Sequence, residues 1–96
     1  MAELKKVWTN TAKAQLKAIY ENYKVKSLQG AKIIKDEILL ATKGLHFVDQ
    51  YQKDEIEPEF RRIIVRHYKL LYIEENGIVF IARIFDTRQD PNKQKE

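Results

Sequence analysis

Apolar residues recur at three- and four-residue spacings through the first half of the chain, and this period predicts two amphipathic helices. The first is expected over residues 11–24, after a run of possible N-caps, with an apolar stripe of Ala12, Leu16, Ile19 and Tyr23. The second is expected between a Ser27 cap and a Gly44 stop, with a stripe of Ala31, Ile34, Ile38, Ala41 and Leu45. Two such helices joined by a few residues predict an antiparallel helical hairpin.

The last third of the chain is rich in β-branched and aromatic residues and predicts three strands, over residues 60–65, 68–74 and 78–85. Asn76-Gly77 separates the last two, and a two-residue turn of this kind is a strong hairpin signal. A short strand over residues 4–8 is expected to join them. The fold class is therefore α+β, in the order β-α-α-β-β-β, with an antiparallel sheet and a helical hairpin packed on one face.

The turn at Asn76-Gly77 also predicts a register, which pairs Glu75 with Ile78, Tyr72 with Ile81, Leu71 with Ala82 and Lys69 with Ile84. Alternation then places one set of side chains on each face of the sheet. The first set is Tyr68, Leu70, Tyr72, Val79, Ile81, Arg83 and Phe85. The second set is Lys69, Leu71, Ile73, Ile78, Phe80, Ala82 and Ile84, continuing to Asp86 and Arg88.

Both predicted faces are largely apolar, and two short helices can cover only one of them. The second face is expected to need another cover, and exposed apolar area of this kind is typical of a partner site. A second copy of the chain, or the polar segment 45–59, could also cover it. A protein partner is the interpretation that we favour.

Composition limits the remaining possibilities. The 96 residues fit one domain, expected over residues 1–88, followed by a polar tail, 89–96, that is expected to fray. The formal net charge of +4 favours anionic partners. The chain has no cysteine, and its apolar runs are too short to span a bilayer. Its start has no signal-peptide pattern, so we expect a cytoplasmic protein without membrane association.

Few kinds of catalysis remain open. The two histidines, His46 and His67, lie far apart in sequence without neighbouring ligands, so neither a metal nor a cofactor is expected. RNA can be cleaved with its own 2′-hydroxyl as nucleophile, which requires cations at the phosphate and a group that transfers protons. Lys69, Arg62 and Arg88 could supply the charge, and His67 is a weaker candidate for the proton. These strand cations could equally be solvated or paired with acidic residues.

Two segments resemble the RelE/ParE family of toxins from bacterial type II toxin–antitoxin systems. Residues 60–72 read FRRIIVRHYKLLY and are similar to the central hairpin of that family. Residues 78–85, followed by Asp86-Thr87-Arg88, are similar to its last strand and trailing arginine motif, and Trp8-Thr9 with Ala12, Leu16 and Ile19 to its entry into the first helix. The resemblance implies a toxin that inhibits growth or stabilises a plasmid, and that is neutralised by a cognate antitoxin.

The family contains two kinds of toxin. RelE-like members cut mRNA on the ribosome, without metal, with basic residues on the open sheet face that Lys69, Arg88 and Arg62 would match. ParE-like members inhibit DNA gyrase. RelE-like members also use a C-terminal tyrosine or histidine, and residues 89–96 contain neither. We therefore favour a ParE-like toxin acting on gyrase or another protein, with an mRNA endoribonuclease and a non-toxic basic interaction domain as alternatives.

The antitoxin, under this interpretation, lays an apolar helix or strand over the uncovered sheet face. It would offer acidic residues to the cations of that face. The residues expected to bind the antitoxin or the target are Lys69, Leu71, Ile73, Phe80 and Arg88.

Overall fold

Four strands and two helices follow one another in the predicted order, which confirms the α+β fold class. The computed structural model describes residues 4–95, so the outermost residues of the two expected units, 1–3 and 96, lie outside it. Its elements are β1 (Lys5–Trp8), α1 (Asn10–Lys24), α2 (Leu28–Lys43), β2 (Arg61–Val65), β3 (Tyr68–Glu75) and β4 (Ile78–Asp86). Short 3₁₀ turns form at Val48–Gln50 (η1) and Pro91–Lys95 (η2).

Both helices begin at side-chain caps. Thr9 Oγ1 accepts a hydrogen bond of 3.1 Å from the Ala12 N–H, and Ser27 Oγ accepts one of 3.0 Å from the Gly30 N–H. Each hydroxyl satisfies a backbone donor that the first helical turn leaves without a partner. α2 ends at Gly44, whose N–H donates to the Leu40 carbonyl at 2.9 Å. The predicted Ser27 cap and Gly44 stop are confirmed.

The sheet has the order β1-β4-β3-β2, with β3 antiparallel to both of its neighbours. β1 pairs parallel to β4, so the sheet is mixed and the expectation of a wholly antiparallel sheet is wrong. A tight turn forces two strands to be antiparallel, but β1 and β4 are separated by the helical hairpin and by two other strands. No turn therefore constrains their relative direction.

A β-bulge in β4 changes the predicted register. Glu75 pairs with Ile78 and Tyr72 with Ile81, as expected, but the register then shifts between Leu71 and Tyr72. Because Ala82 is the extra residue in β4, the expected pairs Leu71 with Ala82 and Lys69 with Ile84 are wrong. Leu71 instead pairs with Arg83 and Lys69 with Phe85.

The bulge exchanges the faces of every residue that follows it in β4. Ile84 and Asp86 share the face of Leu70 and Tyr68, whereas Arg83 and Phe85 share the face of Leu71 and Lys69. The expected face assignment of these β4 residues is therefore wrong from Ala82 onward. A period-two pattern has no means of showing where one extra residue enters a strand.

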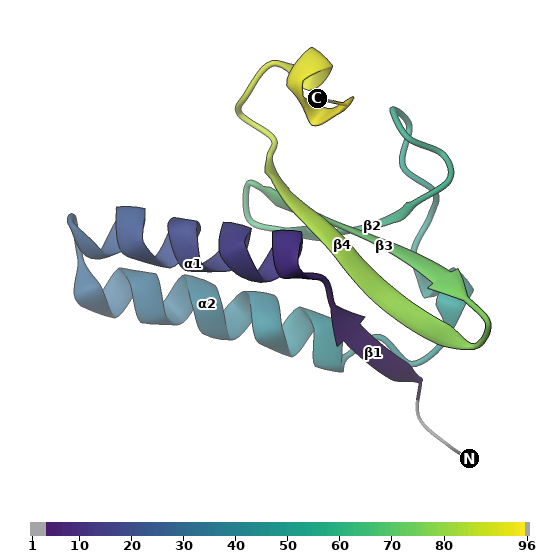
Figure 1. Cartoon of the computed structure of the whole chain (residues 1–96). Coiled ribbons are helices and arrows are strands. Elements are labelled where there is room, and N and C mark those ends of the chain that lie inside the picture. The colour runs from purple at the N-terminus through teal and green to yellow at the C-terminus, as the bar shows by residue number, and fades with distance from the viewer. Residues whose placement is uncertain (1–3, 96) are drawn as a thin grey trace.

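The helical hairpin packs on one face of the sheet and encloses the core (Figure 1). This helix-covered face carries the buried residues Ile63, Val65, Tyr68, Leu70, Tyr72, Val79, Ile81 and Ile84, which meet Ala12, Ile34, Ile38 and Leu45. The Tyr72 hydroxyl donates to the Val48 carbonyl at 2.6 Å, which satisfies the polar end of a fully buried ring. No helix within residues 4–95 is long and apolar enough to cross a membrane.

The segment 51–60 and the tail lie beside the other face of the sheet, rather than extending into solvent (Figure 1). The expectation of a fraying tail is wrong, because Gln94 in η2 is only 1% exposed. A polar side chain becomes buried when partners satisfy it, and a hydropathy pattern does not reveal such partners. The second face is thus partly covered by the chain itself.

The turn between β3 and β4 makes a testable demand on Gly77. Its φ of +82° lies in the left-handed region, so a Gly77→Ala substitution is expected to lower the free energy of unfolding by about 1–2 kcal/mol. Gly44 has a φ of −78°, and a Cβ there would meet only ordinary contacts, so Gly44→Ala serves as the control. Urea denaturation measures both, and equal effects of the two substitutions would contradict the turn geometry.

Candidate functional site

The predicted site lies on the sheet face opposite the helices, and a buried ion pair occupies its centre. Lys69 Nζ lies 2.7 Å from Asp54 Oδ1, and these two residues are 6% and 1% exposed. Asp54 Oδ2 accepts hydrogen bonds from the N–H groups of Ile56 and Glu57 at 3.2 and 2.9 Å. The segment that leads into β2 therefore turns around the Asp54 carboxylate.

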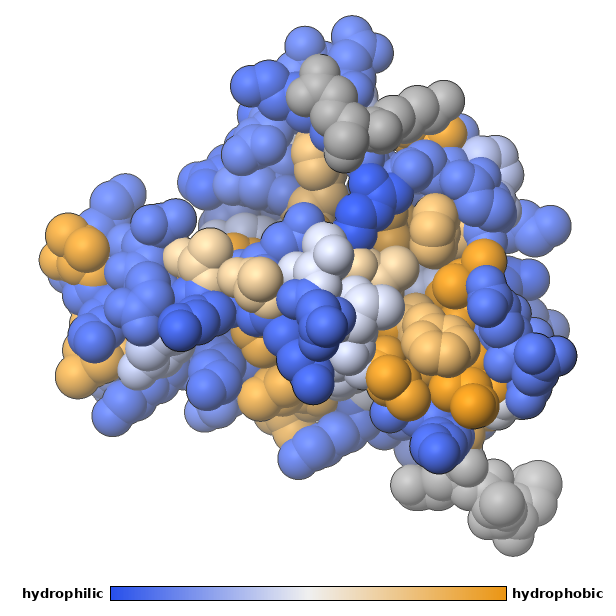
Figure 2. All heavy atoms as spheres, in the orientation of Figure 1, coloured by the Kyte–Doolittle hydropathy of each residue, from blue (hydrophilic) through white to orange (hydrophobic). Residues whose placement is uncertain are grey.

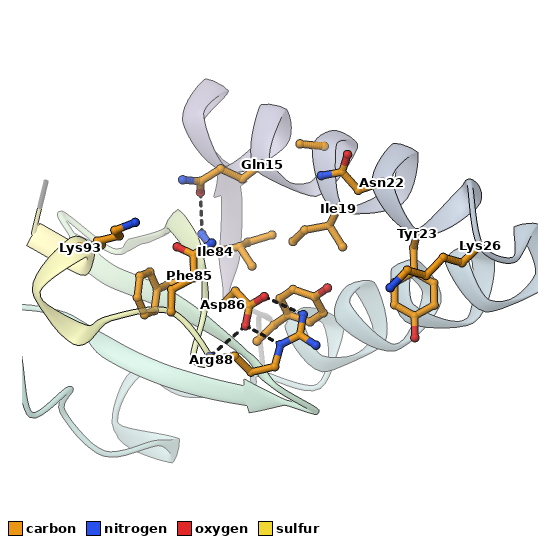
Figure 3. Close-up of a pocket in the computed structure, with 13 residues that line it drawn as sticks. Gln15, Ile19, Asn22, Tyr23, Lys26, Ile84, Phe85, Asp86, Arg88 and Lys93 are labelled. Atoms are coloured by element: carbon orange, nitrogen blue, oxygen red, sulfur yellow. Dashed lines mark hydrogen bonds and ion pairs between the residues drawn. The ribbon is translucent and has the colours of Figure 1, made fainter.

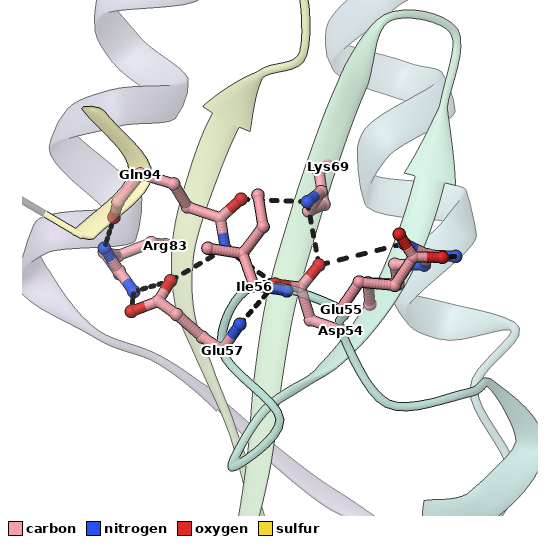
Figure 4. Close-up of polar contacts among 8 residues, drawn as sticks. Asp54, Glu55, Ile56, Glu57, Lys69, Arg83 and Gln94 are labelled. Atoms are coloured by element: carbon pink, nitrogen blue, oxygen red, sulfur yellow. Dashed lines mark hydrogen bonds and ion pairs between the residues drawn. The ribbon is translucent and has the colours of Figure 1, made fainter. Parts of the chain in front are cut away.

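Gln94 connects the tail to this ion pair. Its Oε1 accepts a hydrogen bond from Lys69 Nζ at 2.8 Å, and its Nε2 donates to Asp54 Oδ2 at 2.7 Å. Nε2 also lies 2.8 Å from Glu57 Oε2, as a second hydrogen bond. One amide thus serves both the cation and the carboxylates (Figure 4).

Arg83 completes the cluster on β4. Its guanidinium donates to both carboxylate oxygens of Glu57 and to the backbone carbonyl of Gln94. The same guanidinium lies over the Phe60 ring, 5.6 Å from its centre. We call Asp54, Glu57, Lys69, Arg83 and Gln94 the polar cluster; it joins the 51–60 segment, β3, β4 and the tail.

The hydrogen bonds of the cluster outweigh the desolvation of Asp54. Burial acts to raise the pKa of this carboxyl, since it disfavours the charged form. Hydrogen bonds from Lys69, from Gln94 and from the Glu57 N–H act in the opposite direction, and the net result is a lowered pKa. Asp54 is therefore held as a carboxylate, and the cluster pairs two carboxylates with two cations.

Each of the six strand cations singled out by the sequence has an intramolecular partner. Arg61 donates to the Tyr51 carbonyl, and Arg62 lies 3.9 Å from Asp54 and 3.8 Å from Glu55. The remaining pairs are Arg66 with Glu37, Lys69 with Asp54, Arg83 with Glu57 and Arg88 with Asp86. Their charge is therefore matched within the fold.

The expectation that Lys69 and Arg88 share a sheet face is wrong. Arg88 forms a two-point pair with Asp86, which the bulge places on the helix-covered face, beside Tyr68. The pair lowers the pKa of Asp86, chiefly through the hydrogen bond from Arg88. Lys69 points away from the helices, into the polar cluster. A site that combines these two cations is not formed.

The other predicted binding residues separate into two groups. Leu71 is fully buried, so the expectation that it lies on an uncovered face is wrong. Ile73 and Phe80 face one another across β3 and β4 and are only partly buried. Val7 pairs with Phe80, and Ile78 lies one alternation away on the same face; both are also partly buried.

We call Val7, Ile73, Ile78 and Phe80 the apolar patch. Figure 2 shows apolar atoms gathered over the part of the sheet that lies next to the β3–β4 turn and β1. The polar cluster therefore seals only one end of the second face, and the other end carries apolar side chains that remain accessible.

A groove of about 540 Å³ lies on the opposite side, between α1 and the end of β4. One wall is a line of α1 side chains that includes Gln15, Ile19, Asn22 and Tyr23, and the other includes Ile84, Asp86 and Arg88 (Figure 3). His67 does not line it, and the Nε2 of His67 is buried without a hydrogen-bond partner in the described chain.

The sequence analysis did not find the acidic half of the polar cluster. Asp54, Glu57 and Gln94 lie in segments without periodicity, and only the proximity of two acidic residues three apart could have suggested a cation partner. Among residues 4–95, no group of three acidic residues or histidines is arranged to hold a metal ion. The face thus offers a neutralised cluster, an apolar patch and, behind it, a groove.

Comparison with known proteins identifies relatives. Residues 7–91 match the family model described as "ParE toxin of type II toxin-antitoxin system, parDE". A solved structure described as "Chromosomal ParDE TA system from P. aeruginosa" has the same fold, with a TM-score of 0.78 and 22% sequence identity. The alignment covers 88% of this chain and 96% of that one. The search of curated proteins gave no match.

The first prediction for this site concerns Lys69. Lys69→Met leaves the buried Asp54 carboxylate without its nearest cation and is expected to lower the free energy of unfolding by about 3 kcal/mol. Lys32→Met, an exposed control, should change it by less than about 0.5 kcal/mol. The double variant Asp54→Asn/Lys69→Met should recover part of the loss. Urea denaturation is the measurement, and a double variant less stable than Lys69→Met would contradict a buried charge pair.

The second concerns pH. Because the pKa of Asp54 is lower in the folded chain than in the unfolded chain, its stabilisation is complete above the unfolded value of about 4. It is lost as the pH falls below that value, through the folded pKa. Asp54→Asn should therefore flatten the acid side of the stability profile, whereas Asp36→Asn, at an exposed position, should leave its slope unchanged. Unfolding midpoints between pH 2 and 7 test this, and equal slopes would show that Asp54 is not the coupled carboxyl.

Proposed function

This chain belongs to the ParE toxin family of type II toxin–antitoxin systems, and from that membership we propose that it arrests growth by binding DNA gyrase. In this proposal it acts as a protein-binding inhibitor and does not cleave RNA. The observation that carries the proposal is the polar cluster, which occupies the sheet face where a nuclease of this fold would place its cations.

The state of the cations supports inhibition without cleavage. Stabilisation of a transition state at phosphate requires cations that are aimed at the charge as it develops. Lys69 is 6% exposed and paired with Asp54, while Arg62 has acidic neighbours and Arg88 lies on the other side of the sheet. Bringing Lys69 to a phosphate would leave Asp54 buried and unpaired, at a cost of several kcal/mol.

Proton transfer is equally poorly provided for. Residues 89–96 contain no tyrosine or histidine. His67 packs its ring against Tyr68, at 4.2 Å between centres, and its Nε2 is buried. A general acid or base must reach the reacting group within hydrogen-bond distance. This arrangement therefore favours binding over RNA cleavage.

The apolar patch is the surface that we assign to the protein target. Protein interfaces have apolar, aromatic centres, and Phe80 surrounded by Val7, Ile73 and Ile78 provides one. The proposal includes a ParD antitoxin as the cognate partner, in keeping with the parDE family and with the ParDE system described for the similar structure. The antitoxin would neutralise the toxin by covering the patch.

A gyrase assay tests this function. Purified chain is expected to inhibit supercoiling by DNA gyrase, and Phe80→Lys to abolish the inhibition, because it places a charge in the centre of the patch. Leu40→Lys is the control, since Leu40 is 64% exposed on α2 and outside the patch. Circular dichroism verifies that both variants fold, and Ile73→Lys provides a second test of the patch.

Three results would contradict the proposal. Supercoiling that is unaffected by a several-fold excess of the chain would exclude gyrase as the target. Transcript cleavage on ribosomes that Lys69→Ala and Arg88→Ala abolish would establish the nuclease alternative. Growth that continues when the chain is expressed without an antitoxin would favour a non-toxic interaction domain.

A further inference from the structure

The second half of β4 has a free edge. β1 pairs with β4 only from Ile78 to Ile81, so from Ala82 to Asp86 the strand has β3 on one side and no strand on the other. The Thr87 N–H donates to the His67 carbonyl, on the β3 side. Because backbone groups alternate along a strand, Ile84 and Asp86 direct their N–H and C=O groups to the free edge.

Side chains at the start of α1 occupy the first positions of this edge. Thr9 Oγ1 donates to the Ala82 carbonyl at 2.9 Å, and Gln15 Oε1 accepts from the Ile84 N–H at 2.7 Å. These side chains satisfy groups that a neighbouring strand would otherwise bind. The Ile84 carbonyl and the Asp86 N–H follow on the same edge, and the hydrogen bonds of the described residues show no such substitute for either.

The free edge lies in the groove between α1 and β4, next to apolar side chains. Ile19, Tyr68 and Ile84 line the groove, together with the amides Gln15 and Asn22 (Figure 3). Three cations also line it, Lys26, Arg88 and Lys93, against the single carboxylate of Asp86. Arg88 is paired with Asp86, while Lys26 and Lys93 have no ion-pair partner within residues 4–95.

We propose that this groove binds an extended, acidic segment of the antitoxin, which adds to the sheet as a strand beside β4. The inference rests on the proposed function for the identity of the partner. An added strand would use the edge of β4 that β1 leaves at Ile81, and would hydrogen-bond to the Ile84 carbonyl and the Asp86 N–H. Its acidic side chains would pair with Lys26 and Lys93.

The edge favours a peptide over a nucleic acid. A strand edge presents donors and acceptors in alternation, and a peptide backbone offers the complementary alternation. A ribose–phosphate backbone supplies acceptors for the Asp86 N–H but no regular donor for the Ile84 carbonyl. The cations alone would suit either polymer, so the backbone groups decide between them.

A pair of substitutions at one position isolates the strand pairing. Asp86→Pro removes the N–H at the free edge, whereas Asp86→Ala keeps it, and both lose the pair with Arg88. Neither alters the ladder to β3, because proline is tolerated where the N–H of an edge strand faces away from its neighbour. The probe is the protein encoded beside this chain whose co-expression restores growth.

Asp86→Pro is expected to bind that antitoxin about tenfold more weakly than Asp86→Ala, and amide exchange at Asp86 of the unmodified chain should slow at least tenfold in the complex. Lys26→Glu/Lys93→Glu should also weaken binding, whereas Lys17→Glu/Lys32→Glu, at exposed positions outside the groove, should not. Circular dichroism confirms that the variants fold.

Equal affinities of the two Asp86 variants, or an Asp86 amide that is not protected in the complex, would overturn the inference and leave the toxin function standing. Single-stranded RNA that displaces the antitoxin and binds both Asp86 variants equally would assign the groove to phosphate instead. Failure of the unmodified chain to arrest growth bears on the proposed function alone.

Discussion

The second face of the sheet is organised by the buried ion pair between Asp54 and Lys69. Two opposite charges that are almost fully removed from water stabilise a fold only when their other polar atoms also have partners. Here those partners are the backbone of Ile56 and Glu57 and the amide of Gln94. The 51–60 segment, β3 and the tail must therefore be in place together, and one end of the face is closed by the chain itself.

Closing that end determines where another molecule can bind. The apolar patch remains accessible beside the β3–β4 turn, and the free edge of β4 remains accessible beside α1. The bulge at Ala82 separates the two surfaces, because it directs Arg83 toward the polar cluster and Asp86, with its partner Arg88, toward the groove. One additional residue in β4 thus decides which cations seal the second face and which line the groove.

Local chemistry predicted the elements well, and non-local chemistry could not be predicted. The Ser27 cap, the Gly44 stop and the Asn76-Gly77 turn are each set by a few adjacent residues, and the structure contains all three. The bulge leaves no periodic signal, so the register was wrong beyond Ala82. Asp54 and Gln94 are 40 residues apart, and their contact depends on the complete fold. Ile73 and Phe80 were placed correctly because they precede the bulge in the β3–β4 hairpin.

The side chain at position 94 shows how strictly the cluster is balanced. Asp54 and Glu57 bring two carboxylates, and Lys69 and Arg83 bring two cations, so the charges already cancel. An amide accepts a hydrogen bond from Lys69 and donates to both carboxylates without adding charge. A carboxylate at this position would repel Asp54, and an ammonium group could not accept from Lys69. Glutamine thus anchors the tail and preserves the neutrality that allows this face to stay closed.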